Sequence, residues 1–481
     1  MKDKICSAIR WNLVTELLLK IMAPVINMTL ARILLPEDFG VVAILVMIAS
    51  FSDLFANAGV SKYVIYKRVC SDEENRKLLN VAFTINASLA SIIFILIFFS
   101  SNSISVFFKI PNACDAIRVY SSIILIDAYF GIAVAYLKKI YRFKEYGYIR
   151  LLGRCVHIII TIPLAVWLKS YWALVIGNLL SEIVSVIGLV FYSKVFLNFR
   201  FDVNETREML PFCFGSMVEI LSSWLVFNIG VFFVGKFYGS YYAGIYSTSI
   251  NTVNQIISII NSTALSVLIS ILSEYQGDKG KFLGQINMFQ KNVGLFSIPL
   301  GVGIFLFREF LTNVLLGPTW KDAELLIGLW GFVLCESIIF ADFAGCAIVA
   351  KGKPILLGYS NFIQTILLGI AFYFIKNSEF ETVVIVCCLI RLQLTCTHYL
   401  FAVNLLGKWF GVQRELLVFI FGAVLMGCGF YVLDMNTDND FFVSILNIVV
   451  CIFIYFISIL IFPGGRKCIV NLLRNLFNQK L

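Results

Sequence analysis

Several basic residues lie inside long apolar stretches of the sequence, where little water is available to solvate a charge. Placing a charged side chain at the centre of a membrane-spanning helix costs roughly 2.5–3.5 kcal/mol on insertion scales. A basic residue retained at such a position needs an acidic partner or a function, and its chemistry suits the binding of an anionic group. We therefore select four candidate contacts for an anionic ligand: Lys20, Arg154, Lys291 and Arg391.

Each candidate also has a structural interpretation. Lys20 lies four residues after Glu16, so the two side chains share one helical face and can form an ion pair. Lys291 and Arg391 have no acidic residue within one helical turn, so a partner must come from another helix, from water or from a ligand. Arg154 lies near the end of its apolar stretch, where a long side chain can extend to the membrane surface. Both interpretations stay open for the four residues.

Acidic residues within the apolar stretches are candidates for carrying a coupling proton or cation. Burial disfavours the ionised form of a carboxyl group, so such a group can exchange a proton near neutral pH. Glu16 and Asp127 are the first candidates for this ion-coupling role, and pairing with basic residues is the structural alternative. The other acidic residues of this kind are Asp53, Glu182, Glu219, Glu336 and Asp342.

Other chemistry is sparse in this sequence. The two histidines, His157 and His398, are too few for a zinc site, and the 13 cysteines show no spacing typical of a metal site or a disulfide framework. The sequence contains no Gly-x-x-x-x-Gly-Lys loop that could cradle nucleotide phosphates. We therefore expect no catalytic residues, no metal and no cofactor.

The elements that position these charges are membrane-spanning helices. Hydrophobic residues make up 60% of the 481 residues and charged residues only 14%, against roughly a quarter charged in soluble domains. A helix needs about 20 residues to cross the hydrocarbon layer. Division at the polar segments predicts an all-α polytopic membrane protein with about 14 transmembrane helices. The predicted spans are 8–34, 40–60, 77–100, 115–137, 148–168, 170–193, 209–235, 241–274, 285–307, 322–350, 354–376, 380–407, 414–434 and 440–463.

The distribution of Lys and Arg tests this division, because cytoplasmic loops of membrane proteins are enriched in both. With the N-terminus inside, the basic clusters at 62–77 and 138–150 fall on the cytoplasmic side, whereas most external turns carry a single basic residue, such as Lys109 or Lys169. Both termini are then cytoplasmic. Because this asymmetry explains the net charge of +9, we expect membrane lipids and no nucleic acid as partners.

Two turns of related sequence divide the chain. Pro36 cannot continue the helix before it, and Gly40 permits a tight return into the next helix. Aligning Gly40 with Gly244 places a related turn between the seventh and eighth spans, and the external segments around Pro111 and Pro318 then align as well. Six spans per repeat predict two six-helix lobes in parallel repeat, around a central cavity. The expected parts are an N-terminal lobe at 1–200, a C-terminal lobe at 201–411, and two extra helices with a cytoplasmic tail at 412–481.

The motifs at these turns resemble those of the polysaccharide flippases of the O-antigen and capsule (Wzx-type) family. They are Leu-Pro-Glu-Asp-Phe-Gly at 35–40, Ala-Gly-Val at 58–60 with basic residues behind it, and Leu-Gly-Pro-Thr-Trp at 316–320. The number of predicted spans is similar too. This family belongs to the multidrug/oligosaccharidyl-lipid/polysaccharide exporter superfamily, and its members flip undecaprenyl-pyrophosphate-linked oligosaccharides across the bacterial cytoplasmic membrane.

The resemblance implies a non-enzymatic transporter of the bacterial inner membrane that works by alternating access in O-antigen, capsule or exopolysaccharide biosynthesis. Its partner would be an undecaprenyl pyrophosphate glycan, whose anionic headgroup would contact the four selected basic residues; other polysaccharide-assembly proteins are left open as partners. Two alternatives remain, an integral membrane polysaccharide polymerase or ligase and a drug or cation antiporter of the same superfamily. Short external segments disfavour the enzyme, and basic intramembrane residues disfavour the antiporter.

Overall fold

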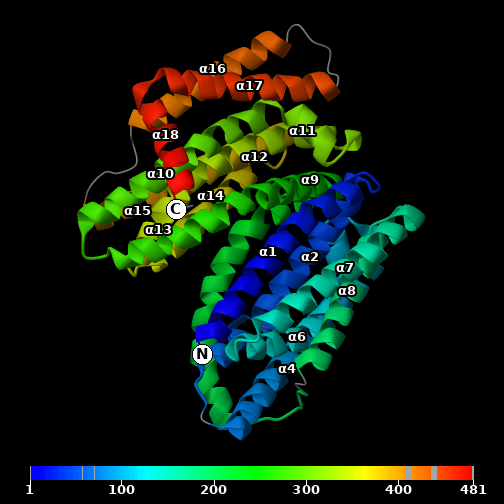
Figure 1. Cartoon of the computed structure of the whole chain (residues 1–481). Helices are drawn as coiled ribbons and strands as arrows, with labels where there is room; N and C mark the ends of the chain where they lie inside the picture. Colours follow the sequence, from blue (N-terminus) through cyan, green and yellow to red (C-terminus); the bar gives the residue numbers. More distant parts are fainter. Residues whose placement is uncertain are drawn as a thin grey trace. The chain divides into compact units, whose positions relative to one another are not determined.

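The computed structural model describes residues 2–56, 58–69, 71–193, 196–407, 414–434 and 441–478. In these ranges the regular secondary structure is helical throughout (Figure 1), which confirms the predicted all-α fold. Among the described residues, thirteen helices are long and apolar enough to cross a membrane. Helices are the expected solution in lipid, because each backbone N–H and C=O group is then satisfied within its own segment.

The chain packs as two compact units, Met1–Thr248 and Ser249–Leu481. The boundary between the two units falls inside one helix, α9 (Val203–Glu274). The predicted lobes are defined by the sequence repeat and not by packing, so their boundaries stay a prediction. The turn between the last two predicted spans, 414–434 and 440–463, lies outside the described residues. The helices of the first unit that precede the shared helix are α1 (Lys2–Ala31), α2 (Pro36–Ala56), α3 (Ala58–Tyr66), α4 (Asp72–Phe107), α5 (Cys114–Ser121), α6 (Ile123–Lys139), α7 (Phe143–Leu168) and α8 (Trp172–Ser193).

The shared helix, α9 (Val203–Glu274), contains both the seventh and the eighth predicted span. Its 72 residues would extend roughly 108 Å at a rise of about 1.5 Å per residue, well beyond the ~30 Å of a single crossing. The helix is broken at Gly239, whose φ of 84° and ψ of −176° are non-helical and suit a residue without a Cβ atom. The break lies between the two predicted spans, so the single element still accounts for both.

The second unit continues from the end of α9 through helices on both sides of a short π-helical turn. These elements are α10 (Lys279–Leu306), α11 (Arg308–Leu315), α12 (Glu324–Ser337), the π-helical turn Ile338–Asp342, α13 (Phe343–Ala350), α14 (Ile355–Ile375), α15 (Phe380–Leu406), α16 (Arg414–Asp434), α17 (Phe441–Ile461) and α18 (Pro463–Asn478). Together α12, the π-helical turn and α13 form the predicted tenth span.

The turn around Pro36 forms as predicted, but Gly40 has another role. α1 ends at Ala31 and Pro36 is the first residue of α2, a position that proline favours. Gly40 lies inside α2, so its expected function as the point of re-entry is wrong. A Cβ atom on Gly40 would overlap the carbonyl oxygen of Ser240, and a Cβ atom on Gly244 would overlap that of Pro36. α2 and α9 therefore cross at a reciprocal contact that requires glycine on both helices.

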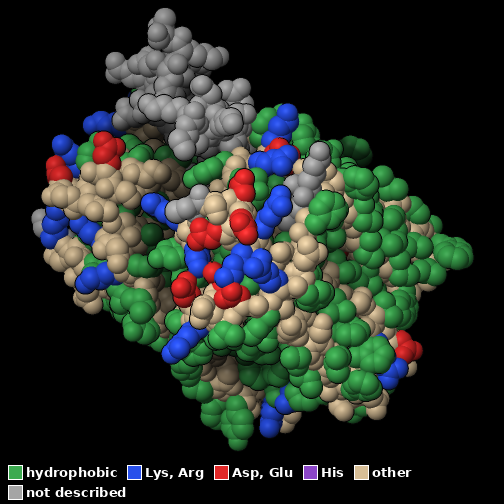
Figure 2. Space-filling model, turned by 90° about the horizontal axis from the view of Figure 1, so that it is seen from below, with side chains coloured by type: hydrophobic (Ala, Val, Ile, Leu, Met, Phe, Trp, Pro, Cys, Tyr) green, Lys and Arg blue, Asp and Glu red, His purple; other side chains and the backbone are tan. Residues whose placement is uncertain are grey.

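Much of the molecular surface is apolar. Phe99, Trp167 and Phe442 are 80%, 79% and 77% exposed, as expected for side chains that face lipid. Figure 2 shows hydrophobic side chains spread over the visible face, with Lys, Arg, Asp and Glu side chains gathered in a mixed group among them. Within this group, basic and acidic side chains lie together.

Candidate functional site

Glu16 of α1 forms an ion pair with Arg150 of α7, whose Nη1 donates to Oε1 of the carboxylate. The two helices pack closely here, since a Cβ atom on Gly147 would lie 2.8 Å from Thr15 Oγ1. The sequence groups Arg150 with the basic residues of a cytoplasmic loop, whereas the structure places it inside α7. The ion-coupling candidate Glu16 thus has a basic partner on another helix.

Arg154 follows Arg150 by one helical turn and lies beside α8. Its guanidinium group interacts electrostatically with Arg150 and with Glu182 of α8. Gly153 allows this approach: Ser181 Oγ donates to its carbonyl oxygen at 2.8 Å. The Arg154 side chain is exposed, whereas Oε2 of Glu182 is buried and accepts no hydrogen bond from the described residues.

Asp127 of α6 belongs to the same charged group of the first unit. It interacts electrostatically with Asp53 of α2 and with Glu182 of α8. α1, α2, α6, α7 and α8 thus bring acidic and basic side chains into one connected group, which we call the unit 1 charge group (Glu16, Asp53, Asp127, Arg150, Arg154 and Glu182). Lys20, half-buried on α1, lies one turn from Glu16.

The other two selected basic residues lie in the second unit, in separate surroundings. Lys291 of α10 donates through Nζ to Oε1 of Glu415 at 2.6 Å, and the two side chains are 23% and 28% exposed. Glu415 lies in the first turn of α16. Of the partners left open for Lys291, another helix, water or a ligand, the structure shows an acidic side chain on another helix.

Arg391 of α15 lies against the π-helical turn and α12. Its guanidinium carbon is 5.8 Å from the ring centroid of Trp330, and it interacts electrostatically with Asp342. Asp342 Oδ2 also accepts a hydrogen bond of 2.7 Å from Asn261 Nδ2. The π-helical turn is itself held by Gln290, whose Nε2 donates to the carbonyl oxygen of Ile339 at 2.9 Å. Such turns frequently occur at functional sites.

Sequence reasoning selected Arg154, Glu16 and Asp127 from the unit 1 charge group but did not select Arg150 as a site residue. The spacing of Arg150 and Arg154 could have indicated it, because residues four apart on a helix are neighbours on its surface. The ion pair between Arg150 and Glu16 could not be predicted from spacing, since the two residues are 134 positions apart.

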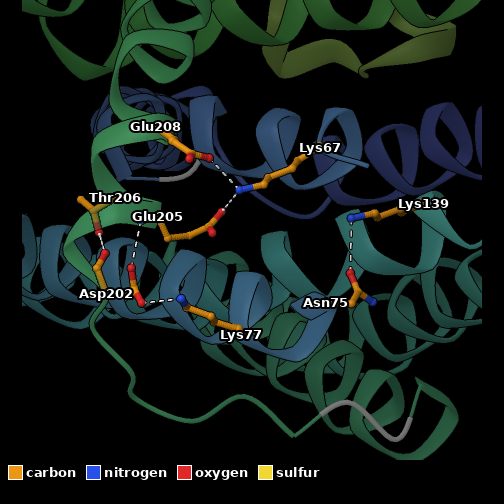
Figure 3. A network of polar contacts seen from close by, with 8 residues as sticks. All are labelled: Lys67, Asn75, Lys77, Lys139, Asp202, Glu205, Thr206 and Glu208. Atoms are coloured by element: carbon orange, nitrogen blue, oxygen red, sulfur yellow. Dashed lines mark hydrogen bonds and ion pairs between the residues drawn. The ribbon is translucent and has the colours of Figure 1, made fainter. Parts of the chain in front are cut away.

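A second network in the first unit holds the start of α9, and we call it the Lys67 network (Lys67, Lys77, Asp202, Glu205 and Glu208). Figure 3 shows Lys67 Nζ between Glu205 Oε1 at 2.6 Å and Glu208 Oε2 at 2.9 Å. Lys77 Nζ lies 2.5 Å from Asp202 Oδ2, and Asp202 Oδ1 accepts from the backbone N–H of Glu205 at 3.0 Å. These basic residues of the predicted cytoplasmic cluster therefore fix one helix against others.

The ionisation of Lys67 and Asp202 reflects these contacts. Partial burial works to lower the pKa of Lys67, but hydrogen bonds with Glu205 and Glu208 outweigh it and raise the pKa above its usual value. The pKa of Asp202 is lowered, first by its hydrogen bond with Lys77 and then by the Glu205 backbone N–H. Both residues therefore carry their charges at neutral pH.

The second unit contains an apolar cavity of about 400 Å³. It is lined by side chains of α9, α10, α11, α12, α16 and α17, among them Phe296, Pro299, Ile304, Met426 and Ile452. α16 and α17 are the two extra helices of the predicted organisation, so they provide part of an apolar surface that could hold a hydrocarbon chain.

The fold and its charged interior define a polytopic helical membrane protein. A family model described as "Polysaccharide biosynthesis protein" matches residues 29–325. Because this match covers more than half of the chain, the chain belongs to that family. The family resemblance inferred from the turns is confirmed.

Two similar proteins have names that refer to succinoglycan or lipopolysaccharide biosynthesis. The succinoglycan biosynthesis transport protein ExoT of Rhizobium meliloti (strain 1021) is 22% identical over 304 residues, which cover 62% of this chain and 60% of ExoT. The lipopolysaccharide biosynthesis protein WzxC of Escherichia coli (strain K12) is 18% identical over 324 residues, or 67% of this chain and 65% of WzxC. The chain thus matches somewhat under two thirds of the length of these two relatives.

Solved structures share the fold. The lipid II flippase MurJ, in an inward closed conformation, aligns with a TM-score of 0.75 at 14% identity, over 94% of this chain and 98% of MurJ. An inward-facing multidrug resistance transporter of the MATE family aligns with a TM-score of 0.64 at 13% identity, over 81% of this chain and 94% of the transporter. The expected exporter-superfamily fold is confirmed by both.

Proposed function

We propose that this protein flips an undecaprenyl-pyrophosphate-linked oligosaccharide across the bacterial cytoplasmic membrane by alternating access, without chemical change to the substrate. The observation that carries the proposal is the presence of two opposite kinds of surface in one chain. The unit 1 charge group offers charged side chains within membrane-spanning helices, and the second unit offers an apolar cavity. The proposed substrate has a matching composition, because its pyrophosphate and sugars are polar and its polyprenyl tail is apolar.

The similar proteins and the shared fold also support this proposal. ExoT is named as a transport protein of succinoglycan biosynthesis, and MurJ as a lipid II flippase. The first name describes a transport protein and the second a protein that flips a lipid. Membership of a polysaccharide biosynthesis family favours the same class of cargo for this chain.

Roles for the selected residues follow from their positions. We propose Lys20, Arg154, Lys291 and Arg391 as contacts of the anionic headgroup at successive stages of transport. Glu16 and Asp127 are the proposed carriers of a coupling proton or cation. Both termini are placed in the cytoplasm, with the predicted lobes 1–200 and 201–411 rocking about a central cavity.

Transport by the purified protein tests the proposed function. The full chain is reconstituted into liposomes with a fluorescent oligosaccharide on undecaprenyl pyrophosphate, and exposure of the sugar to a membrane-impermeant lectin is followed over time. We expect exchange between leaflets well above that of empty liposomes, and recovery of an unaltered lipid-linked glycan. A fluorescent phosphatidylcholine serves as the control, because its equal exchange would indicate unspecific lipid scrambling.

Two results would contradict the proposed function. Absence of leaflet exchange across a panel of repeat units would reject the flippase proposal. A lengthened or transferred glycan in the recovered lipid would instead identify a polymerase or ligase.

A further inference from the structure

Two arginines on α7 stand one helical turn apart, at positions 150 and 154. Side chains with this spacing are neighbours, about 5–6 Å apart at Cβ, and like charges at this spacing destabilise a helix. The structure shows the consequence, because Arg150 and Arg154 interact electrostatically. Retaining two guanidinium groups side by side near the end of a membrane-spanning helix therefore calls for compensation.

Carboxylates from both neighbouring helices supply that compensation. Glu16 of α1 pairs with Arg150, and Glu182 of α8 interacts with Arg154. The Arg150 and Glu16 side chains are 31% and 38% exposed, so a ligand can reach this ion pair. Glu182 Oε2 is buried, but it accepts no hydrogen bond within the described part of the chain, so no hydrogen bond from Arg154 holds that oxygen in place. The arginines are thus balanced by anions that a competing anion can replace.

Close helix packing fixes where the two arginines stand. α7 approaches α1 at Gly147, one turn before Arg150, and approaches α8 at Gly153, directly before Arg154. The Arg150 guanidinium carbon also lies 5.4 Å from the ring centroid of Tyr146, a cation–π contact that restricts its orientation. The pair is therefore held in place by the helices around it.

We propose that Arg150 and Arg154 bind the pyrophosphate of the lipid-linked substrate, one guanidinium group to each phosphate, by displacing Glu16 and Glu182. This proposal rests on the proposed function and adds a recognition site to it. Guanidinium groups bind phosphate through two parallel hydrogen bonds, which a lysine cannot reproduce. Lys20, one turn after Glu16 on α1, provides the released carboxylate with another cation.

The geometry also gives the site a specificity. Two adjacent guanidinium groups suit a pyrophosphate better than a single phosphate, so the pair should distinguish pyrophosphate-linked from monophosphate-linked lipids. With the predicted topology, residues 150 and 154 lie near the cytoplasmic end of α7. That is the leaflet from which the proposed transport begins, so the pair serves the loading of substrate.

The test compares one oligosaccharide on undecaprenyl pyrophosphate with the same oligosaccharide on undecaprenyl monophosphate, in liposomes containing the full chain. We expect wild-type protein to prefer the pyrophosphate. The double variant Arg150→Lys and Arg154→Lys keeps both charges, and we expect its pyrophosphate-linked transport to fall about tenfold or more, since lysine cannot form the two parallel hydrogen bonds that a guanidinium group makes to phosphate. Its monophosphate-linked transport should change little. Arg142→Lys, which alters the ion pair with Glu145 at the start of the same helix, is the matched control and should leave both rates unchanged.

A charge exchange separates recognition from structure. The variant Glu16→Arg with Arg150→Glu restores an ion pair between α1 and α7, so its melting temperature in detergent should stay near that of wild type, whereas transport should stay low. Recovery of wild-type transport and selectivity by this exchange would show a structural ion pair and overturn the proposal.

Other outcomes are equally decisive. Equal wild-type rates for the two lipids would overturn the arginine site and leave the flippase proposal intact, whereas no transport of either lipid would reject the flippase proposal itself. Stabilisation of the purified protein by inorganic pyrophosphate, with no effect of the lysine variants on lipid transport, would assign the pair to a free anion and also overturn the proposal.

Discussion

Intramembrane basic side chains of this protein lie beside carboxylates: Arg154 beside Glu182, Lys291 beside Glu415 and Arg391 beside Asp342. Opposite charges offset the cost of removing each ion from water, although a pair adds little net stability when desolvation is counted. Substitution of these residues can therefore have two different effects. A pair that only joins helices affects stability, whereas a residue that meets substrate affects transport.

Lys291 and Glu415 allow these two roles to be separated. We expect a double-mutant cycle with Lys291→Ala and Glu415→Ala to show a coupling of about 1 kcal/mol in unfolding in detergent, typical of partly exposed ion pairs. Transport by Lys291→Ala should fall further than that of Glu415→Ala if Lys291 contacts the headgroup. Equal transport by the two single variants would assign Lys291 to helix packing alone.

At the scale of elements, α9 is held to the first unit at two places along its length. The Lys67 network binds its first turns, and the crossing with α2 at Gly40 and Gly244 binds it beyond Gly239. The two attachments differ in kind, because ion pairs respond to pH and salt, whereas contact between backbones responds only to side-chain volume.

The Lys67 network predicts a defined pH dependence. The pKa of Asp202 is lowered, so its contribution to stability is present above its unfolded value of about 3.9 and is lost as the pH falls through the folded value. The pKa of Lys67 is raised, so its contribution is present below about 10.4 and is lost as the pH rises through the folded value.

The difference in melting temperature between wild type and the variant Lys67→Ala with Lys77→Ala should therefore stay constant from about pH 5 to pH 9 and shrink below about pH 4. Arg118→Ala, which removes the exposed ion pair with Asp115, is the control for general charge loss. A difference that changes steadily across neutral pH would contradict the assignment.

At the crossing of α2 and α9, replacing glycine even by alanine should have a strong effect on stability. Gly40→Ala places a Cβ atom on the carbonyl oxygen of Ser240, so α2 and α9 must separate, and we expect a loss of stability of at least 2 kcal/mol, in the upper part of the range for single substitutions. Gly215→Ala is the matched control in α9, because no atom lies within 4 Å of the added Cβ. That change should be neutral or stabilising by up to about 1 kcal/mol, and melting in detergent compares the two.

At the scale of the whole molecule, the two packing units and the distribution of charge describe a membrane transporter with charged residues inside its helices. The proposed orientation of the chain rests on its basic loops, because Lys and Arg are typically retained on the cytoplasmic side of membrane proteins. In the proposed orientation the α7 arginine pair lies near the cytoplasmic side, so the proposed loading of substrate depends on that orientation.

Reporter fusions test the orientation directly. A fusion in the turn at 139–142, between α6 and α7, should report a cytoplasmic position, and a fusion at 169–171, between α7 and α8, an external one. The opposite result at both turns would invert the map and place Arg150 and Arg154 at the external end of α7, whereas the opposite result at one turn would contradict α7 as a membrane-spanning helix.

The sequence alone determined the membrane environment, the helical fold and the approximate ends of the spans. It also located the charges inside the spans, because hydropathy and backbone hydrogen bonding in lipid act over one segment at a time. Pro36 marked the turn between the first two spans for a similarly local reason, because proline disrupts a helix interior, but the start of α2 at Pro36 rather than at residue 40 was not predicted.

Tertiary structure decided which charges meet and where helices touch. Glu16 and Arg150 are 134 residues apart, and Lys291 and Glu415 are 124 apart, so neither pairing is encoded in local spacing. Gly40 looked like a turn residue and proved to be a crossing point, because its role depends on the carbonyl oxygen of Ser240 on a distant helix. Burial and pairing are properties of packed helices, and only packing brings such residues together.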